Sequence, residues 1–256
     1  MTRVLALLPL LAFSAAASQE WVSLFDGQSL DGWTPKIRGY PAGENFADTF
    51  RIVDGAITVA YDGYESFDAR YGHLFFDTPY SHYRLRLEYR FVGDQAPDGE
   101  GWAYRNSGVM FHAQSPESMP DEQDFPISIE FQFLGGKADG NPRPTAAMCS
   151  PGTEIDIDGT RASDHCVPSE APTFVGDDWV RVELLVEGAD RVVHYVEGEP
   201  VIEYGNLTIG GGVVSGHDPA MKTDGESLSR GHIALQSESH PIQFRRIELL
   251  DLSDGN

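Results

Sequence analysis

The stretch from Trp102 to Gly136 reads WAYRNSGVMFHAQSPESMPDEQDFPISIEFQFLGG and holds two strand-like runs, residues 106–112 and 127–133. Side chains alternate between the faces of a strand, so one face of the second run is apolar and the other carries Glu130 beside Gln132, about 7 Å apart. The apolar set is Ile127, Ile129, Phe131 and Phe133. We predict that the apolar face is buried and that the polar face lines a ligand site. A solvated strand is the alternative, although such strands usually carry Lys, Thr or Arg there.

Residues 1–18 have the pattern of a secretory signal peptide. Arg3 precedes an apolar run at 4–13 and small residues at 14–18, and the mature chain would begin near Ser18 or Gln19. The apolar run is too short to span a bilayer, and no other stretch is long enough. The 256 residues otherwise fit one large all-β domain, which we place at 19–252. We expect a periplasmic or secreted protein without a membrane span.

The chain is strongly acidic, with 40 Asp and Glu against 18 Lys and Arg and a formal net charge of −22. Nucleic acid is disfavoured as a partner because phosphate binding needs Lys and Arg on one face. Anionic polysaccharides are disfavoured for the same reason. A neutral oligosaccharide or glycoside is the natural expectation, while the acidity itself also serves solubility.

Two cysteines, Cys149 and Cys166, lie 17 positions apart. An even number of cysteines in an exported protein predicts one disulfide, worth about 3 kcal/mol on the chain-entropy model. His165 is adjacent, but one imidazole does not complete a zinc site with these two thiols. We therefore predict a disulfide.

Short strands separated by turn residues follow one another from Trp21, and almost no helical periodicity is present. Asp54-Gly55 between residues 50–53 and 56–59 is a strong hairpin signal. Residues 83–91 alternate cleanly between apolar and polar. Residues 135–174 are rich in Gly, Pro, Asp and Thr and predict a long excursion held by the disulfide. Ten or more short strands without helical crossovers indicate an all-β sandwich of jelly-roll type in a single domain.

Several motifs, in this order and spacing, resemble the 3-keto-disaccharide hydrolase domain family over about Trp21 to Leu250. They are Leu24-Phe25-Asp26-Gly27, Leu30-Asp31-Gly32-Trp33, Arg105-Asn106-Ser107-Gly108-Val109, Glu130-Phe131-Gln132, and 231–236 ahead of 244–247. The resemblance implies a concanavalin- or laminin-G-like jelly roll. It also implies an enzyme that cleaves 3-keto-glucosides, by hydrolysis or by 1,2-elimination. The chain departs from the commonest pattern after Gln236, where His-Gly often follows soon and the order here is Ser237-Glu238-Ser239-His240-Pro241.

The chemistry of a 3-keto-glycoside assigns roles to these residues, because the ketone acidifies the proton at C2. General-base catalysis needs a carboxylate or imidazole, and the enolate needs fixed donors or a cation. We predict Glu130, His240 and Arg105 as the catalytic residues, His240 because the resemblance places a His near there. The predicted substrate-binding residues are Asn106, His112, Gln132, Gln236, Glu238, Trp102 and Tyr104. A divalent metal joining Glu130 to a His stays an open alternative that no spacing requires. His165 and His194 are expected to have no catalytic duty.

Two other functions stay open. Thr153 to Gly159 looks like the E-x-D-x-E strand of retaining β-glucanases, with Glu154 and Asp158 as the carboxylates. In a regular strand these two would lie about 13 Å apart, against about 5.5 Å for a retaining pair. A non-catalytic carbohydrate-binding module would instead use Trp33, Trp102 and Tyr104 to stack on sugars.

Overall fold

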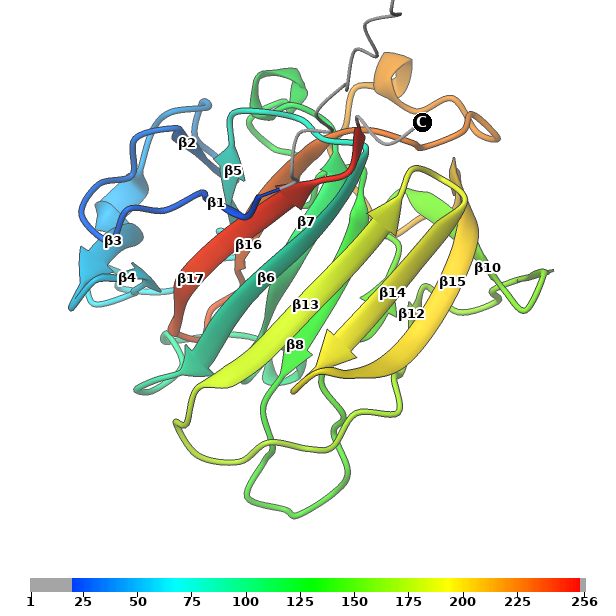
Figure 1. Ribbon diagram of the computed structural model, residues 1–256. Helices are drawn as coiled ribbons and strands as arrows, with labels where there is room; N and C mark the ends of the chain where they lie inside the picture. The colour runs from blue at the N-terminus through cyan, green and yellow to red at the C-terminus, as the bar shows by residue number, and fades with distance from the viewer. Residues whose placement is uncertain (1–19, 254–256) are drawn as a thin grey trace, which may run out of the picture.

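The computed structural model describes residues 20–253, in which two antiparallel sheets pack face to face (Figure 1). The larger sheet has the order β11-β10-β15-β14-β13-β6-β17-β4-β3, with β1 paired to β17. Its strands are β1 (Val22–Ser23), β3 (Phe50–Val53), β4 (Ala56–Val59), β6 (His82–Phe91), β10 (Thr153–Ile157), β11 (Thr160–Arg161), β13 (Val180–Glu187), β14 (Arg191–Val196), β15 (Glu199–Ile209) and β17 (Ile242–Asp251).

The smaller sheet has the order β12-β9-β8-β7-β16-β5-β2 and lies behind the larger one in Figure 1. Its strands are β2 (Trp33–Ile37), β5 (Gly72–Phe76), β7 (Asn106–Ala113), β8 (Ile129–Leu134), β9 (Ala147–Cys149), β12 (Cys166–Val167) and β16 (His232–Ser237). Short 3₁₀ turns are η1 (Phe46–Asp48), η2 (Gly101–Ala103), η3 (Pro116–Ser118) and η4 (Pro219–Met221). The predicted all-β jelly-roll sandwich is confirmed.

The core lies between the sheets and follows the alternation seen in the sequence. In β6 every second side chain is buried, from Tyr83 to Phe91. The ring of Tyr89 stacks on Phe133 of β8 with centroids 4.3 Å apart, and Phe131 packs on His194 at 4.2 Å. Truncating such a buried Phe to Ala typically costs about 3–5 kcal/mol. The apolar face predicted for 127–133 is therefore the inner face of the smaller sheet, and Glu130 and Gln132 lie on its outer face.

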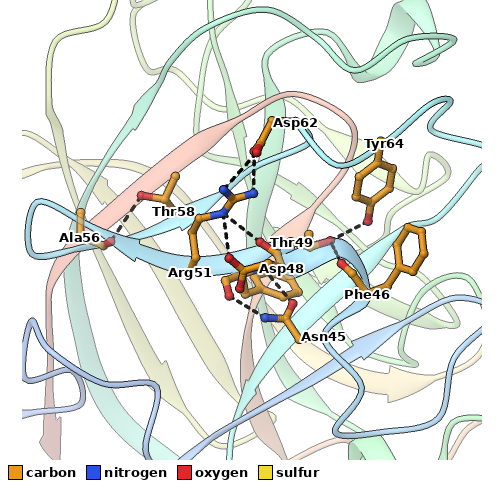
Figure 2. Close-up of polar contacts among 10 residues, drawn as sticks. Asn45, Phe46, Asp48, Thr49, Arg51, Ala56, Thr58, Asp62 and Tyr64 are labelled. Carbon is orange, nitrogen blue, oxygen red and sulfur yellow. Dashed lines mark hydrogen bonds and ion pairs between the residues drawn. The ribbon is translucent and has the colours of Figure 1, made fainter.

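The hairpin β3–β4 forms at the predicted Asp54-Gly55 turn, where both residues have positive φ as a type I′ turn requires. Polar contacts fix the segments around it (Figure 2). Arg51 forms an ion pair with Asp62 at 2.6 Å, and the Thr49 hydroxyl lies 2.6 Å from the Tyr64 hydroxyl. Asn45 bonds both backbone groups of Phe50. This hairpin is joined to the sheet through β4 and β17.

The excursion predicted for 135–174 is only partly a loop, because it contributes β9 and β12 to the smaller sheet and β10 and β11 to the larger one. The predicted disulfide between Cys149 and Cys166 is confirmed, with an S–S distance of 2.04 Å. These two residues are also direct partners across the β9–β12 ladder. The disulfide thus closes the edge of the smaller sheet.

The predicted signal peptide at 1–18 lies outside the described residues. Across residues 20–253, none of the helical turns has the length and apolar character needed to cross a membrane.

Candidate functional site

The outer face of the smaller sheet brings together polar side chains from neighbouring strands. Residues directly opposite each other in an antiparallel ladder project to the same face. The ladders pair Met110 with Glu130, Gly108 with Gln132, and His73 with Gln236. Because Phe131 and Leu235 point into the core, these side chains point away from it.

A pocket of about 520 Å³ opens on this face. Its volume falls within the range of about 300–1,000 Å³ usual for small-molecule sites. The lining residues come from the sheet and from the loops around it: Trp102, Asn106, Phe125, Glu130, Gln132, Leu134, Arg143, Cys149, Pro151, His165, Cys166, Val213 and Glu238.

Two buried carboxyl groups, Glu130 and Glu238, form the polar centre of this pocket. Glu130 is 6% exposed and Glu238 is 3% exposed. Between them lies Gln236, whose Nε2 donates to Glu238 Oε1 at 3.5 Å. Burial raises the pKa of Glu130 to about 8, opposed in part by a hydrogen bond from Gln236. Burial and the neighbouring Glu130 raise the pKa of Glu238 well above its usual value, while Arg143 lowers it. The pair therefore holds at least one proton near neutral pH, as like-charged neighbours in a desolvated site do.

A glycine gives the Glu130 side chain its space. A Cβ atom on Gly108 would lie 2.9 Å from Glu130 Oε1 and 3.1 Å from Glu130 Cγ. The Glu130 carboxyl group thus lies over β7 and reaches toward Gln236 on the next strand, β16.

The cation of the pocket is Arg143, on the loop before β9. Its Nη1 donates to the carbonyl oxygens of Tyr104, Arg105 and Gly135 at 2.6, 3.0 and 2.8 Å, and its Nη2 donates to Trp102 O at 3.0 Å. These acceptors are neutral, and the guanidinium interacts electrostatically with Glu238. Arg143 therefore brings a fixed positive charge to the two acids.

Buried polar atoms without a protein partner gather on this face. They are Asn106 Oδ1, Glu130 Oε1, Gln236 Oε1, Glu238 Oε2 and both ring nitrogens of His73. A buried polar group without a hydrogen bond costs about 1–3 kcal/mol. A polyhydroxylated ligand would supply donors and acceptors to the atoms that face the pocket.

The structure brings together most of the predicted sheet residues. Glu130, Asn106, Gln132, Glu238 and Trp102 all line the pocket. Gln236 is fully buried beside the two acids instead of lining it.

Arg105 and Tyr104 were predicted to be site residues, but neither lines the pocket. Arg105 has a φ of +44° and its guanidinium bonds Gly176 O at 2.5 Å and Asp177 at 2.9 Å, on a neighbouring loop. Tyr104 packs edge-on against His240 with ring centroids 5.0 Å apart. The guanidinium that lines the pocket belongs to Arg143 and not to Arg105.

His112 and His240 are likewise outside the pocket. One extra residue in β7, opposite the interval from His232 to Ala234, forms a bulge in which His112 has a φ of +47°. The bulge turns His112 inward, where its Nε2 contacts Gly188 O at 2.9 Å. His240 follows Ser239, whose φ is +83°, and lies between the rings of Phe91 and Tyr104. The titratable side chain that lies beside Glu130 in the pocket is Glu238.

Sequence reasoning missed Arg143 and two aromatic residues, Tyr71 and Phe125. Tyr71 packs on Phe125 at 4.9 Å and on Trp102 at 6.1 Å between ring centroids, which makes one wall of the pocket. Its pKa is raised to about 12, first by burial and then by nearby acids including Glu238. These residues lie on loops or at a strand end, where no periodicity marks them. The one available signal was the rigid sequence Pro142-Arg143-Pro144.

The β-glucanase alternative finds no support in this geometry. Glu154 lies on β10 of the larger sheet, and Asp158 lies in the β10–β11 turn with a φ of +50°. Arg161 pairs with Glu154 at 3.6 Å and with Asp156 at 2.9 Å. Neither Glu154 nor Asp158 lines the pocket that contains Glu130.

A metal site is not indicated by the ligand set. Within residues 20–253, no three His, Cys, Asp or Glu side chains gather in an arrangement that could hold a metal ion. His240, the predicted imidazole partner, is separate from the carboxyl pair.

Solved structures of low sequence identity share the fold. A candidate glycosyl hydrolase from Parabacteroides distasonis ATCC 8503 aligns with a TM-score of 0.52 and 15% identity over 91% of this chain and 94% of its own. A protein of unknown function with a galectin-like fold from Bacillus subtilis aligns with a TM-score of 0.54 and 10% identity, again over 91% and 94%. A Crh5 transglycosylase solved in complex with NAG aligns with a TM-score of 0.50 and 12% identity over 93% of this chain and 86% of its own.

No curated protein matches this sequence. Residues 20–250, nearly all of the described chain, match one protein family along their whole length. Three of the motifs on which the sequence resemblance rested contribute to this site, through Asn106 and Gly108, through Glu130 and Gln132, and through Gln236. The chain belongs to the family of 3-keto-alpha-glucoside-1,2-lyase-like domains.

Proposed function

We propose that this protein is an exported enzyme that cleaves the glycosidic bond of 3-keto-glucosides. The observation that carries the proposal is the buried carboxyl pair, Glu130 and Glu238, in a pocket on the outer face of the smaller sheet. The family supports a carbohydrate-related activity. A pair with raised pKa values suits general acid–base chemistry near neutral pH.

The reaction follows from the acidity that a C3 ketone gives to the C2 proton. The deprotonated member of the pair removes that proton, and the electrons of the C2–H bond move toward the ketone oxygen as an enolate. The enolate then forms a C1–C2 double bond and expels the oxygen at C1, which takes a proton from the protonated member. The products are an unsaturated keto sugar and the free aglycone, and addition of water to the former would give the hydrolysis product.

Arg143 is the residue we assign to the enolate oxygen. Its guanidinium is held by four main-chain carbonyls and lines the same pocket as the acids. A preorganised charge at such a position is worth about 3–4 kcal/mol in comparable sites. Asn106 and Gln132 lie beside it and have side chains suited to the sugar hydroxyls.

Export and a neutral substrate are part of the proposal. The disulfide between Cys149 and Cys166 suits an oxidising compartment, in line with the signal sequence expected at 1–18. The net charge of −22 favours an uncharged sugar over an anionic one.

The test is to incubate residues 19–256 with a 3-keto-disaccharide and with the matching plain disaccharide, each with and without a chelator. We expect cleavage of the keto sugar alone, and exchange of its C2 proton in D₂O followed by NMR. Glu130→Gln should abolish both, whereas Glu154→Gln, which alters a carboxylate outside the pocket, should change neither. Cleavage of the plain disaccharide alone would contradict the proposal.

A second candidate is a carbohydrate-binding module, favoured by one observation. Trp102 stands half-exposed at the pocket, at 50% of its full accessibility, as sugar-stacking residues do. Such a module would bind the keto sugar without turnover, and Glu130→Gln would have no activity to lose. Calorimetry beside the NMR assay separates the two functions.

A further inference from the structure

The pocket has a polar floor between two apolar walls. The floor consists of Asn106, Glu130, Gln132 and Glu238, with Arg143 at one end. One wall is aromatic, formed by Trp102 and Phe125 with Tyr71 packed against both.

The other wall is built around the disulfide. Cys149 is the direct ladder partner of Glu130, so the disulfide begins one strand away from the acid. Cys166, Pro151 and Val213 continue this wall, and Val213 is 51% exposed. The sulfurs, the proline ring and the isopropyl group offer no hydrogen-bond donor and only weak acceptors.

A second sugar ring would fit this second wall poorly. Its hydroxyls point outward around the ring and would lie against sulfur and hydrocarbon, where an unpaired hydroxyl loses its hydrogen bonds to water. A flat apolar ring has no hydroxyl groups and therefore loses no hydrogen bonds to water when it is buried there. It would instead gain contacts with the aromatic side chains, the disulfide sulfurs and Val213, since rings stack on one another and sulfur contacts aromatic rings favourably.

The size and the polarity of the pocket also favour an apolar group bound beside one sugar. About 520 Å³ accommodates a drug-sized ligand of more than one ring. The polar side chains of the floor come from β7, from β8 and from Glu238 just after the end of β16, where they can serve one sugar. The rest of the pocket is bounded by the two apolar walls and by Leu134, with the imidazole of His165 as a further polar side chain that lines it.

We propose that the space between the Trp102–Phe125 wall and the Cys149–Cys166 wall binds a planar aromatic aglycone, so that the substrate is an aryl glycoside whose sugar lies on the carboxyl pair. This inference rests on the proposed function for the identity of the sugar. It adds the chemical class of the leaving group.

Calorimetry with unoxidised glycosides tests the aglycone site without turnover of the 3-keto sugar. The ligands are phenyl, cyclohexyl and methyl glucosides of both anomers. We expect one phenyl glucoside to bind at least about 10-fold more tightly than the matching methyl glucoside, with the cyclohexyl compound weaker than the phenyl. Val213→Ser should remove at least about 3-fold of the phenyl advantage without changing methyl glucoside affinity. Val175→Ser, at a residue 69% exposed and outside this pocket, is the matched control.

The outcomes separate the two proposals. Phenyl glucosides that bind no better than methyl glucosides would overturn the aglycone site, even if a 3-keto-disaccharide is cleaved. A phenyl preference that Val213→Ser reduces would uphold the site, even if no 3-keto sugar is turned over and the proposed reaction fails. An equal loss of the preference in Val213→Ser and Val175→Ser would also overturn it.

Discussion

Gly108 lies directly beneath the Glu130 carboxyl group, and a Cβ atom at this glycine would be 2.9 Å from Glu130 Oε1 and 2.8 Å from Phe131 O. Contacts this short require one of the groups to move. The absence of a side chain on β7 is thus what allows a carboxyl group from β8 to approach Gln236 on β16.

Gly108→Ala is therefore expected to displace Glu130 and to lower kcat by about 10-fold or more, because proton transfer depends on position. The close approach to Phe131 O, a backbone atom, should also cost stability. Kinetics and thermal unfolding measure the two effects. Gly101→Ala is the control, since its Cβ would meet nothing within 4 Å. Equal kcat in Gly108→Ala and wild type would contradict the role of this space.

Glu238→Gln should reduce kcat by about 10²–10⁴-fold, the usual contribution of a general acid or base. The substitution also removes a titrating group whose own pKa is raised by burial and by the neighbouring Glu130. The remaining activity should therefore lose one limb of its bell-shaped pH profile. A variant with an unchanged profile would show that Glu238 only supports the fold.

Arg143→Lys is expected to lower kcat by about 10²-fold or more, because a lysine cannot bond four carbonyl oxygens at once. Arg105→Lys is a matched control on the neighbouring segment, where the guanidinium bonds Gly176 and Asp177. Its kcat should stay within about 3-fold of wild type. A larger loss in Arg105→Lys than in Arg143→Lys would restore the role that the sequence suggested for Arg105.

Stability should fall as pH rises from about 6.5 to 8. The pKa of Glu130 is raised to about 8, and the pKa of Glu238 is raised as well. Both groups ionise near their usual values in the unfolded chain, so the folded protein binds more protons in this window and loses stability as they are released into solution. Glu130→Gln should flatten the dependence of Tm on pH, and Glu154→Gln should preserve it. A wild-type Tm that rises between these pH values would contradict the raised pKa values.

Below about pH 6.5 the buried histidines have the opposite effect. Burial lowers the pKa of His73 and His194 to about 3 and that of His112 to about 4. The unfolded chain binds these protons first, so stability falls as pH decreases. This is why the effect of the carboxyl pair has to be measured above pH 6.5.

Removal of the disulfide by Cys149→Ala with Cys166→Ala should cost about 3 kcal/mol for a closed loop of this length. For a domain of this size the loss corresponds to a Tm lower by about 6–12 °C. Because both residues line the pocket, affinity for a phenyl glucoside should fall as well. Retained affinity at a lowered Tm would limit the disulfide to a structural role.

The fold and half of the site follow from strand periodicity. The alternation in 83–91 and 127–133 correctly separates core from outer face, and it places Glu130 and Gln132 on the face where the pocket opens. The same reasoning places Glu238 on the polar face of the strand that contains Gln236. Where strands are regular, the two-residue alternation of side chains is sufficient to assign each residue to the inner or the outer face.

The errors lie where that regularity ends. His112 is at a bulge, and one extra residue reverses the face of every position after it. Arg105 has a positive φ, and His240 follows Ser239, which also has a positive φ; no pattern in the sequence predicts either conformation. Arg143 and Phe125 lie on loops whose path depends on tertiary contacts.

The anchoring of Arg143 has a consequence for how this site can vary. The four oxygens that hold the guanidinium belong to the main chain of residues 102, 104, 105 and 135, so any amino acid at those positions supplies the same acceptors. The orientation of the positive charge is thus encoded in the route of the backbone and tolerates substitution around it. Mutational drift at Tyr104 or Arg105 would leave the charge in place, whereas a deletion that shortens either loop would remove it.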